Sequence, residues 1–432
     1  MMELWCCIPL LWLRALMRDW FNVKIVDYFN SDELYMEKDE DSEGELLSQP
    51  SNDPQKDCQG EEFTTKHLRI AVCSWNVAGR TPPTNLNLTD LLDCDGLVDI
   101  YIMGFQEVVP LNVWNVCFLE DSEPANQWQI LIEDAMNRLG CGSDGSMMES
   151  NNLILPSDEE SLTVPLISLD GNVPYKLSGH SRKQASYVRV ASKQMVGIHI
   201  SIWVRRTICK FVHSLSVSCV GVGLMGCLGN KGSIAVSMKL HQTSFCFICS
   251  HLTSGIEKEH EERRNSDAAE ILKRTYFPLC NTAARSNLES VWGHDQIFWL
   301  GDFNYRLDLK DNEIRYLVAE KNWTCLFEKD QLRKHSMKGY IFEGWHEGII
   351  DFPPTYKYEF GSNQYAGENL GYKDKQRPPA WCDRVLWRGR GMKLLSYRRA
   401  EYTFSDHRPV IAIFSSEVLM PSSDQISRAN KT

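Results

Sequence analysis

Hydrophobic and polar positions alternate or run together in a pattern that predicts a series of buried strands. Apolar runs typical of strands occupy residues 68–75, 100–105, about 196–204, 216–222, 233–240, 245–250, 297–300, 381–387 and 409–414. Apolar residues at helical spacing predict a helix at 128–139 and a charged amphipathic helix at 257–276. The sequence has no internal repeat. Many strands interrupted by a few helices indicate one layered α+β domain.

Polar and acidic stretches set the limits of that domain. We expect residues 1–66 to form an amphipathic segment followed by an acidic flexible linker, residues 67–415 to form the folded domain, and residues 416–432 to form a polar tail. Between about residues 141 and 186 the composition turns to Ser, Gly, Asn and Asp with little periodicity. That stretch is predicted to be an exposed insertion.

The net charge of −11 belongs to the linker. Residues 27–62 hold 13 acidic and 2 basic residues, so the remainder of the chain is balanced at 44 of each sign. The acidity therefore says little about what the folded domain binds. With 432 residues, of which 43% are hydrophobic, the chain can bury one large core or two ordinary ones.

Cysteine content and the first residues bear on the compartment. The fifteen cysteines, an odd number without framework spacing, indicate a reduced environment. The apolar run at residues 4–13 is too short to span a bilayer, and an amphipathic docking helix at 4–21 is the better interpretation. We therefore expect a cytoplasmic protein with peripheral contact at the plasma membrane.

Polar residues gather where the strand at 297–300 ends. Gly301 breaks the apolar run, and Asp302 and Asn304 follow two positions apart, so an extended backbone would aim both to one side. A carboxylate and an amide at the end of a buried strand can orient a water and a phosphoryl oxygen together. A single Asp-x-Asn is more typical of a strand entering a turn. Five other polar clusters at strand ends favour a site here.

Three of the candidate residues end other buried strands. Asn76 and Glu107 offer oxygen ligands of the kind that Mg²⁺ prefers, although each alone is typical of a turn or of the surface. His251 can donate to a developing phosphoryl charge, and the alternative is a structural histidine with satisfied hydrogen bonds.

A second group of candidates lies near the end of the chain. Asp406 and His407 place a carboxylate next to an imidazole, and Asp383 can orient that imidazole from another strand. The alternative interpretation is that Ser405, Asp406 and His407 form a turn or a helix start.

Basic residues form a third group. Lys231 lies in a glycine-rich loop suited to an anion, which departs from the P-loop pattern because Gly232 follows the lysine. Residues 372–399 hold 9 Lys or Arg against 2 acidic residues, and residues 355–358 add a lysine between two tyrosines. This composition fits either an ordinary solvated face or a site for a substrate with several phosphates.

Two stretches identify a resemblance. Residues 298–306, FWLGDFNYR, and residues 377–386, RPPAWCDRVL, resemble the two signature motifs of the inositol polyphosphate 5-phosphatases. The clusters at Asn76, Glu107, His251 and His407 are similar to motifs of the wider superfamily of deoxyribonuclease I and the apurinic endonucleases. The similarity runs from about residue 68 to 414, and residues 191–197 most resemble the plant type I branch.

The resemblance implies a fold and a reaction chemistry. The fold would be a four-layer α/β/β/α sandwich of two mixed β-sheets with outer helices. Asn76 and Glu107 would hold Mg²⁺, and Asp302 would position or deprotonate the attacking water. Asn304 would hold the water or a phosphate oxygen, and His251 and His407 would stabilise the phosphorane-like charge. Asp383 would pair with His407, and Asp406 would support the metal side.

The resemblance also implies a substrate class. Tyr356, Lys357, Lys375 and Arg377 would grip the 4-phosphate beside the scissile 5-phosphate, and Lys231 would bind substrate from its loop. The expected activity is Mg²⁺-dependent removal of the 5-phosphate from inositol 1,4,5-trisphosphate, inositol 1,3,4,5-tetrakisphosphate or phosphatidylinositol 4,5-bisphosphate. Such an activity would end or tune phosphoinositide signalling. The sequence leaves the protein partners of this chain unidentified.

Two alternatives come from other functional classes. A nuclease of the same superfamily would need a long basic groove, whereas the cations here cluster in one compact region, so no nucleic-acid partner is expected. A silent scaffold that binds phosphoinositides would be expected to lack one of the predicted site residues, and all of them are present.

Overall fold

The computed structural model of the chain divides into two units, residues 1–59 and 60–432. The structure describes residues 63–92, 94, 96–111, 121–139, 186–223, 226, 228–278, 288–367 and 377–421. The predictions for the amphipathic segment, the acidic linker, nearly all of the insertion, and the tail beyond residue 421 fall outside the described residues. Within the described residues no helix is long and apolar enough to cross a membrane.

The first of two large sheets has the strand order β13-β14-β1-β2-β4-β3. Its strands, in chain order, are β1 (Phe63–Asn76), β2 (Ile100–Gln106), β3 (Tyr187–Met195), β4 (Ile198–Arg205), β13 (Met392–Arg399) and β14 (Val410–Pro421). The central pair β1 and β2 is parallel. The other neighbours are antiparallel, so the sheet is mixed.

The second sheet has the order β11-β12-β10-β7-β6-β5. Its strands are β5 (Val212–Gly221), β6 (Gly232–Leu240), β7 (Thr243–His251), β10 (Gln296–Asp302), β11 (His346–Glu347) and β12 (Asp383–Gly389). Here too the central pair, β7 and β10, is parallel and its neighbours are antiparallel. A small separate sheet pairs β8 (Tyr276–Pro278) with β9 (Leu288–Ser290).

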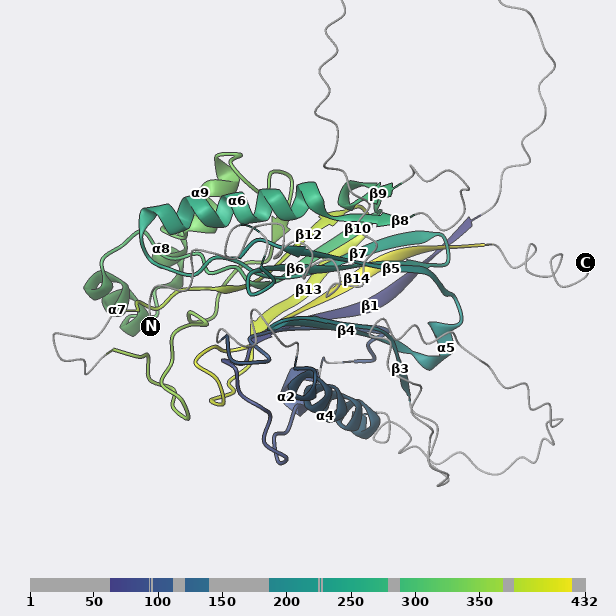
Figure 1. Cartoon of the computed structure of the whole chain (residues 1–432), viewed down its shortest axis with the longest axis horizontal. Helices are drawn as coiled ribbons and strands as arrows, with labels where there is room; N and C mark the ends of the chain where they lie inside the picture. The colour runs from purple at the N-terminus through teal and green to yellow at the C-terminus, as the bar shows by residue number, and fades with distance from the viewer. Residues whose placement is uncertain are drawn as a thin grey trace, which may run out of the picture. The chain divides into compact units, whose positions relative to one another are not determined.

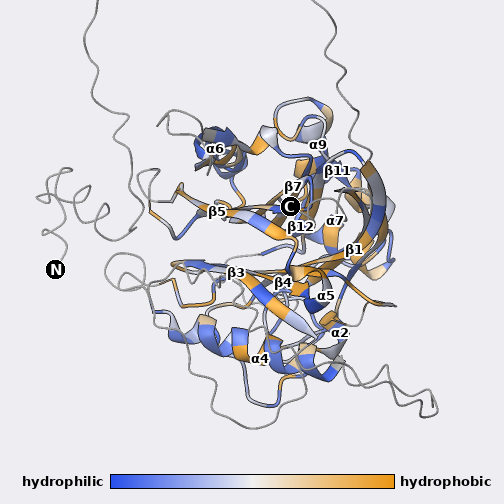
Figure 2. Cartoon of the chain, turned by 90° about the vertical axis from the view of Figure 1, so that its right-hand side faces the viewer, coloured by the Kyte–Doolittle hydropathy of each residue, from blue (hydrophilic) through white to orange (hydrophobic). Residues whose placement is uncertain are grey.

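Helices cover the outer face of each sheet, which gives the four layers expected from the sequence (Figures 1 and 2). Trp128 and Ile132 of α4 (Glu123–Leu139) pack in the apolar cluster outside the first sheet, and Ala268 and Ile271 of α6 (Lys258–Arg274) pack outside the second. The shorter helices are α2 (Thr89–Leu92), α5 (Arg206–Cys209), the 3₁₀ turn η2 (Val291–Gly293), α7 (Asp311–Ala319), α8 (Trp323–Phe327) and α9 (Gln331–Met337).

Side-chain alternation divides each strand between an outer and an inner face. In β1, Cys73 and Trp75 belong to the cluster under α4, so Val72, Ser74 and Asn76 face the other sheet. The two inner faces approach closely at Gly104 of β2. A Cβ atom there would lie 2.5 Å from Leu300 Cδ1, so the sheets can meet only over a glycine.

Some details differ from the sequence-based expectation. The strand expected at about 196–204 is β4, but it begins two residues later, because Val196 and Gly197 form the turn between β3 and β4, and Val196 takes a φ of 52°. Strand β3 was not predicted, since it is an edge strand with mostly half-buried residues and a weak pattern. The folded domain was expected at 67–415, whereas β1 starts at Phe63 and β14 continues to Pro421.

Candidate active site

Strand register brings the candidate residues to one edge of the sandwich. In the second sheet, Asp302 at the end of β10 pairs with His251 on one side and with Asp383 on the other. In the first sheet, Asn76 at the end of β1 pairs with Gln106 at the end of β2. Because each polar residue is the last of an inner-facing row, all of them meet where the two sheets stop facing each other.

Asp302 is the most connected of these side chains. It is 1% exposed, and its Oδ2 accepts a hydrogen bond from Asn76 Nδ2 at 2.9 Å and lies 3.2 Å from His251 Nε2. Its Oδ1 accepts from the Asn304 backbone N–H at 3.1 Å. Burial opposes ionisation, but the hydrogen bond and charge of His251, with the positive charges of His407 and Lys231, outweigh it and lower the pKa of Asp302. The carboxylate is therefore ionised and held in one orientation.

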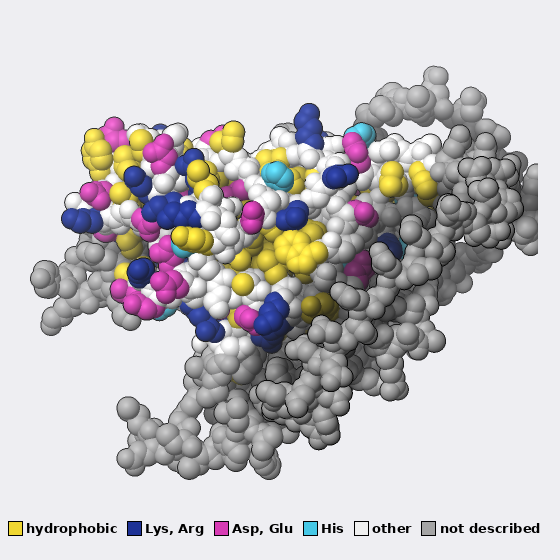
Figure 3. Space-filling model, turned by 90° about the horizontal axis from the view of Figure 1, so that it is seen from above, with side chains coloured by type: hydrophobic (Ala, Val, Ile, Leu, Met, Phe, Trp, Pro, Cys, Tyr) yellow, Lys and Arg dark blue, Asp and Glu magenta, His cyan; other side chains and the backbone are white. Residues whose placement is uncertain are grey.

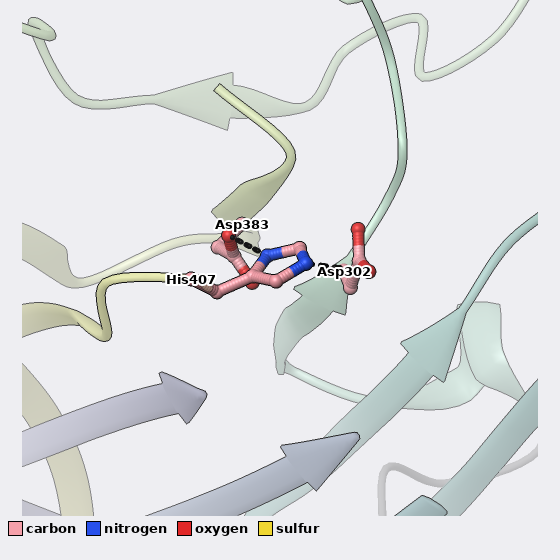
Figure 4. Close-up of side chains that lie close together, drawn as sticks. All are labelled: Asp302, Asp383 and His407. Atoms are coloured by element: carbon pink, nitrogen blue, oxygen red, sulfur yellow. Dashed lines mark hydrogen bonds and ion pairs between the residues drawn. The ribbon is translucent and has the colours of Figure 1, made fainter. Parts of the chain in front are cut away.

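His407 and Asp383 form a buried dyad next to Asp302. His407 Nδ1 lies 2.8 Å from Asp383 Oδ2, which also accepts a 2.7 Å hydrogen bond from Thr355 Oγ1. Figure 4 shows the imidazole ring between the two carboxylates, with His407 Nε2 4.0 Å from Asp302. Burial alone would lower the pKa of His407, but the charge and hydrogen bond of Asp383 raise it to about 9.

The dyad is therefore a proton-bearing pair at neutral pH. Burial raises the pKa of Asp383 to about 6, which still leaves this carboxylate ionised near pH 7. The ligand atoms of His407, Asp383 and Asp302 lie within 4.8 Å of one another, close enough for a metal cluster. We interpret the group as a dyad instead, because Nδ1 is already bonded to Asp383 and a charged imidazole repels a cation.

Lys231 approaches His251 from the glycine-rich loop between β5 and β6. Its Nζ contacts His251 Nε2. Burial lowers the pKa of Lys231, and burial together with the Lys231 charge lowers the pKa of His251. Two arginines of α6 hold the loop, since Arg263 donates to the Val222 carbonyl and Arg274 donates to the carbonyls of residues 221 and 226. The lysine charge is thus fixed at the site by a tethered loop.

Glu107 stands at the open side of the first sheet. It follows β2 in a left-handed conformation, with a φ of 53°, which is a strained position for a residue with a side chain. Its side chain is 30% exposed, and its Oε1 lies 3.3 Å from Asn76 Nδ2. Asn76 Oδ1 in turn accepts from the Ala78 backbone N–H. Asn76 therefore links the carboxylates of Glu107 and Asp302.

These residues line a cleft of about 220 Å³. Its opposite wall comes from the segment before β12, where the Tyr356 ring lies 4.5 Å from that of His407, between ring centroids. Lys357 Nζ lies 3.5 Å from Asp406 Oδ2 on this wall. Of the residues predicted from the sequence, those that line the cleft are Glu107, His251, Asp302, Asn304, Tyr356, Lys357, Arg377, Asp406 and His407.

The remaining predicted residues have other places. Asn76 and Asp383 lie behind the cleft wall and contact Asp302 and His407, and Lys231 contacts His251. Lys375 lies outside the described residues. Asp406 was expected to support the metal side, and its charged contact is with Lys357, so that role stays a prediction.

Three residues of the site were not predicted. Arg306 and Ser254 line the cleft, and Thr355 holds Asp383 from behind. A signal for Arg306 was present in the sequence, because it continues the two-residue spacing of Asp302 and Asn304. Thr355 and Ser254 lie in loops whose paths the local sequence does not determine.

Comparisons with known proteins show which family this chain resembles. A family model described as Endonuclease/Exonuclease/phosphatase family 2 matches residues 73–413. Among relatives from Arabidopsis thaliana, type I inositol polyphosphate 5-phosphatase 4 is 41% identical over 84% of this chain and 80% of its own. Type I inositol polyphosphate 5-phosphatase 8 is 41% identical over 94% and 85%. Type IV inositol polyphosphate 5-phosphatase 9 is 42% identical over 82% and 79%.

Solved structures show the same fold. The inositol polyphosphate 5-phosphatase domain of a synaptojanin, in complex with inositol (1,4)-bisphosphate and calcium, matches with a TM-score of 0.65 and 27% identity over 84% of this chain and 88% of that one. Cimex nitrophorin matches with a TM-score of 0.53 and 18% identity over 82% and 99%. The second similarity concerns the fold alone.

Proposed function

This chain belongs to the inositol polyphosphate 5-phosphatases, and from that premise we propose that it uses Mg²⁺ to remove the 5-phosphate from inositol 1,4,5-trisphosphate, inositol 1,3,4,5-tetrakisphosphate and phosphatidylinositol 4,5-bisphosphate. One observation carries the proposal. An ionised Asp302 lies 4.0 Å from the protonated His407–Asp383 dyad in a small cleft whose opposite wall carries Tyr356, Lys357 and Arg377. The group formed by Asp302, His407 and Asp383 can act on one phosphate, and the side chains of the opposite wall can hold the neighbouring phosphate.

The catalytic half acts on the scissile phosphate. Asp302 accepts a hydrogen bond from the attacking water, and its low pKa favours orienting that water over removing its proton at rest. The water oxygen bonds to phosphorus, the ester bond to the inositol oxygen breaks, and that oxygen takes up a proton. His407 carries a positive charge where negative charge grows on the phosphoryl oxygens.

The donor set at the first sheet fits a hard divalent cation. Glu107 offers a partly exposed carboxylate, and Asn76 lies beside it with an amide. We assign Mg²⁺ to these two residues, with Asp302 adjacent. When bound, Mg²⁺ supplies Lewis-acid polarisation of a phosphoryl oxygen. The orientation of Glu107 on a strained backbone position is consistent with a functional requirement for its direction.

The far wall of the cleft grips the phosphate that is not cleaved. Tyr356, Lys357 and Arg377 offer one phenol and two cations there, and Lys375 belongs to the same proposed group. Lys357 is already 3.5 Å from Asp406, so a phosphate would compete with that carboxylate for the ammonium group. Asp406 thereby disfavours the binding of weakly charged ligands to Lys357.

The distribution of charged residues favours a compact polyphosphate over a polynucleotide. A nucleic-acid backbone needs cations spread along a groove. On the face that carries α6, the described side chains show basic and acidic groups interspersed, without a continuous basic stripe (Figure 3). The cations named above are instead concentrated at one cleft.

The test is phosphate release from inositol 1,4,5-trisphosphate and from phosphatidylinositol 4,5-bisphosphate in vesicles, each with Mg²⁺ and with excess chelator. We expect Mg²⁺-dependent release from both. A DNA oligonucleotide serves as the third substrate, and we expect it to stay intact. Undiminished turnover in chelator would overturn the assignment of Glu107 and Asn76. Cleavage of DNA without release from either inositol substrate would favour the nuclease alternative.

A further inference from the structure

Arg306 occupies the floor of the cleft with a role that the proposed function leaves open. It follows Asn304 by two residues, and its side chain, only 5% exposed, lines the cleft together with Asp302 and His407. Its guanidinium carbon lies 4.6 Å from the ring centroid of Tyr356. The guanidinium is thus placed between the residue that orients the attacking water and the wall that grips the neighbouring phosphate.

Two of the three guanidinium nitrogens of Arg306 are committed to Asn304. Nε donates to the Asn304 carbonyl oxygen at 3.0 Å, and Nη2 donates to Asn304 Oδ1 at 2.6 Å. Nη1 is buried and makes no hydrogen bond of ordinary geometry among the described residues. Burial lowers the pKa of Arg306, but the charge of Asp302 and a contact with the Tyr356 side chain help to raise it. A buried donor of a charged group without a partner is unfavourable, and a bound ligand, ion or water is one explanation for such a group in a native protein.

Arg384, which is equally buried, shows how this chain treats a purely structural guanidinium. Its Nη1 lies 2.9 Å from Asp330, and its Nη2 lies 2.6 Å from Glu347, so two carboxylates balance one charge. Arg306 has no carboxylate within ion-pair distance among the described residues. The difference leaves Nη1 of a buried cation without a carboxylate in direct contact, although the nearby charge of Asp302 helps to stabilise the cation.

We propose that Arg306 is a further catalytic residue, whose Nη1 donates to an oxygen of the phosphate that is cleaved. Asn304 fixes the other two nitrogens, so Nη1 is held in position for a planar, charge-assisted contact of the kind that guanidinium groups make with phosphate. The neighbouring positions of Asp302 and His407 place that phosphate at the scissile bond. This inference rests on the proposed function, because it needs a phosphomonoester bound in the cleft.

The first test separates direct contact from an effect through Asn304. We would measure kcat/KM for wild type, Arg306→Met, Asn304→Ala and the double variant. Direct contact predicts a loss of about 10²- to 10³-fold for Arg306→Met, the usual scale for one donor to transition-state charge. It also predicts that adding Arg306→Met to Asn304→Ala lowers kcat/KM by at least about tenfold more. If the added cost is less than about twofold, Arg306 acts only by positioning Asn304 and the proposal is wrong.

The second test separates the scissile phosphate from its neighbour. A substrate with only the 5-phosphate and one with adjacent 4- and 5-phosphates should lose the same factor in Arg306→Met. A loss confined to the 4,5-substrate would assign Arg306 to the neighbouring phosphate and overturn the proposal. Arg306→Lys, which keeps the charge without the planar fork, should retain more activity than Arg306→Met, and equal activity of the two variants would contradict the contact.

The controls distinguish a variant that does not fold, an error in the proposed function and an error in the role given to Arg306. Arg388→Met is the matched variant, because Arg388 stacks on Trp292 at the far end of β12 and should keep wild-type kinetics. Thermal unfolding of Arg306→Met and Arg306→Lys shows whether each variant is folded. Wild-type protein without 5-phosphatase activity would overturn the proposed function. Active wild type with an equally active, folded Arg306→Met would overturn only this inference.

Discussion

The two sheets reach the active site with the same topology and opposite environments. Each has a parallel central pair, and in each the last inner-facing residues are polar. The second sheet ends in His251, Asp302 and Asp383, all at most 1% exposed. The first ends in buried Asn76 and in Glu107, whose side chain is 30% exposed on a left-handed residue.

The contrast shows how one strand pattern supports two kinds of chemistry. At the end of the second sheet, Asp302 and Asp383 are buried against His407, which lies in the loop before β14 of the first sheet. Their interaction lowers the pKa of Asp302 and raises that of His407. On the first sheet, the carboxylate of Glu107 is open to solvent, from which a hydrated cation can arrive. In the proposed function, the two edges thus divide the work, with fixed charges on one side and the proposed exchangeable metal on the other.

Asp302→Asn should give the largest effect, because it removes the carboxylate charge that contacts both Asn76 of the first sheet and His251 of the second. We expect turnover to fall by roughly 10²- to 10⁴-fold while the fold persists, since the amide keeps the size of the side chain. Steady-state kinetics and circular dichroism of the purified variant measure the two quantities. Additional Mg²⁺ should not restore the rate. A variant with near-native turnover would remove Asp302 from its assigned role.

Loss of the far-wall cations should come next. If Lys375 and Arg377 hold the 4-phosphate, the double Ala variant should lose on the order of 10- to 1000-fold in kcat/KM on a 4,5-bisphosphorylated substrate, as expected for charge-assisted hydrogen bonds. A substrate with only the 5-phosphate should be far less affected. The ratio of the two values is measured at low and high salt, because general attraction of anions would weaken both substrates alike and fade with salt.

Glu107→Gln should act on metal dependence. We expect the Mg²⁺ concentration for half-maximal rate to rise by at least about tenfold, because a neutral amide is a weaker ligand than a carboxylate. Saturating Mg²⁺ should restore part of the turnover, in contrast to Asp302→Asn. An unchanged Mg²⁺ titration would place the metal elsewhere and end the division of work between the two edges.

The sequence predicted the polar residues at the strand ends better than it predicted the loop residues that complete the site. Period-two alternation and polar strand ends were enough to collect Asn76, His251 and Asp302, because register follows from burial of the inner faces. The same logic failed for β3, whose half-buried edge lacks a clear pattern. Thr355 reaches Asp383 from a loop 28 residues away, and the backbone path of such a loop is set by tertiary contacts.

Arg306 illustrates a different limit of the sequence. Its position within the motif at 298–306 was visible, but its unpartnered Nη1 could be recognised only once the bonds of the other two nitrogens were known. Burial and hydrogen-bond satisfaction are properties of the packed molecule, and no spacing rule supplies them.

The smallest effect we predict is a pH dependence. Its cause is either the His407–Asp383 dyad or Lys231, and two variants distinguish them. The pKa of His407 is raised from its ordinary value of 6.5 to about 9, so the charged imidazole is present below pH 9 and lost as pH rises through it. We expect log kcat/KM to fall by about one for each pH unit above 9, where the substrate phosphates are already fully ionised. His407→Asn should abolish this limb.

Lys231 also has a lowered pKa because of burial, so its deprotonation is the competing cause of the same limb. Lys231→Arg keeps the positive charge at every pH in the range, since a guanidinium does not titrate there. If the limb stays at pH 9 in Lys231→Arg and disappears in His407→Asn, the His407–Asp383 dyad controls it. If the limb moves in Lys231→Arg, deprotonation of Lys231 in the glycine-rich loop controls it instead.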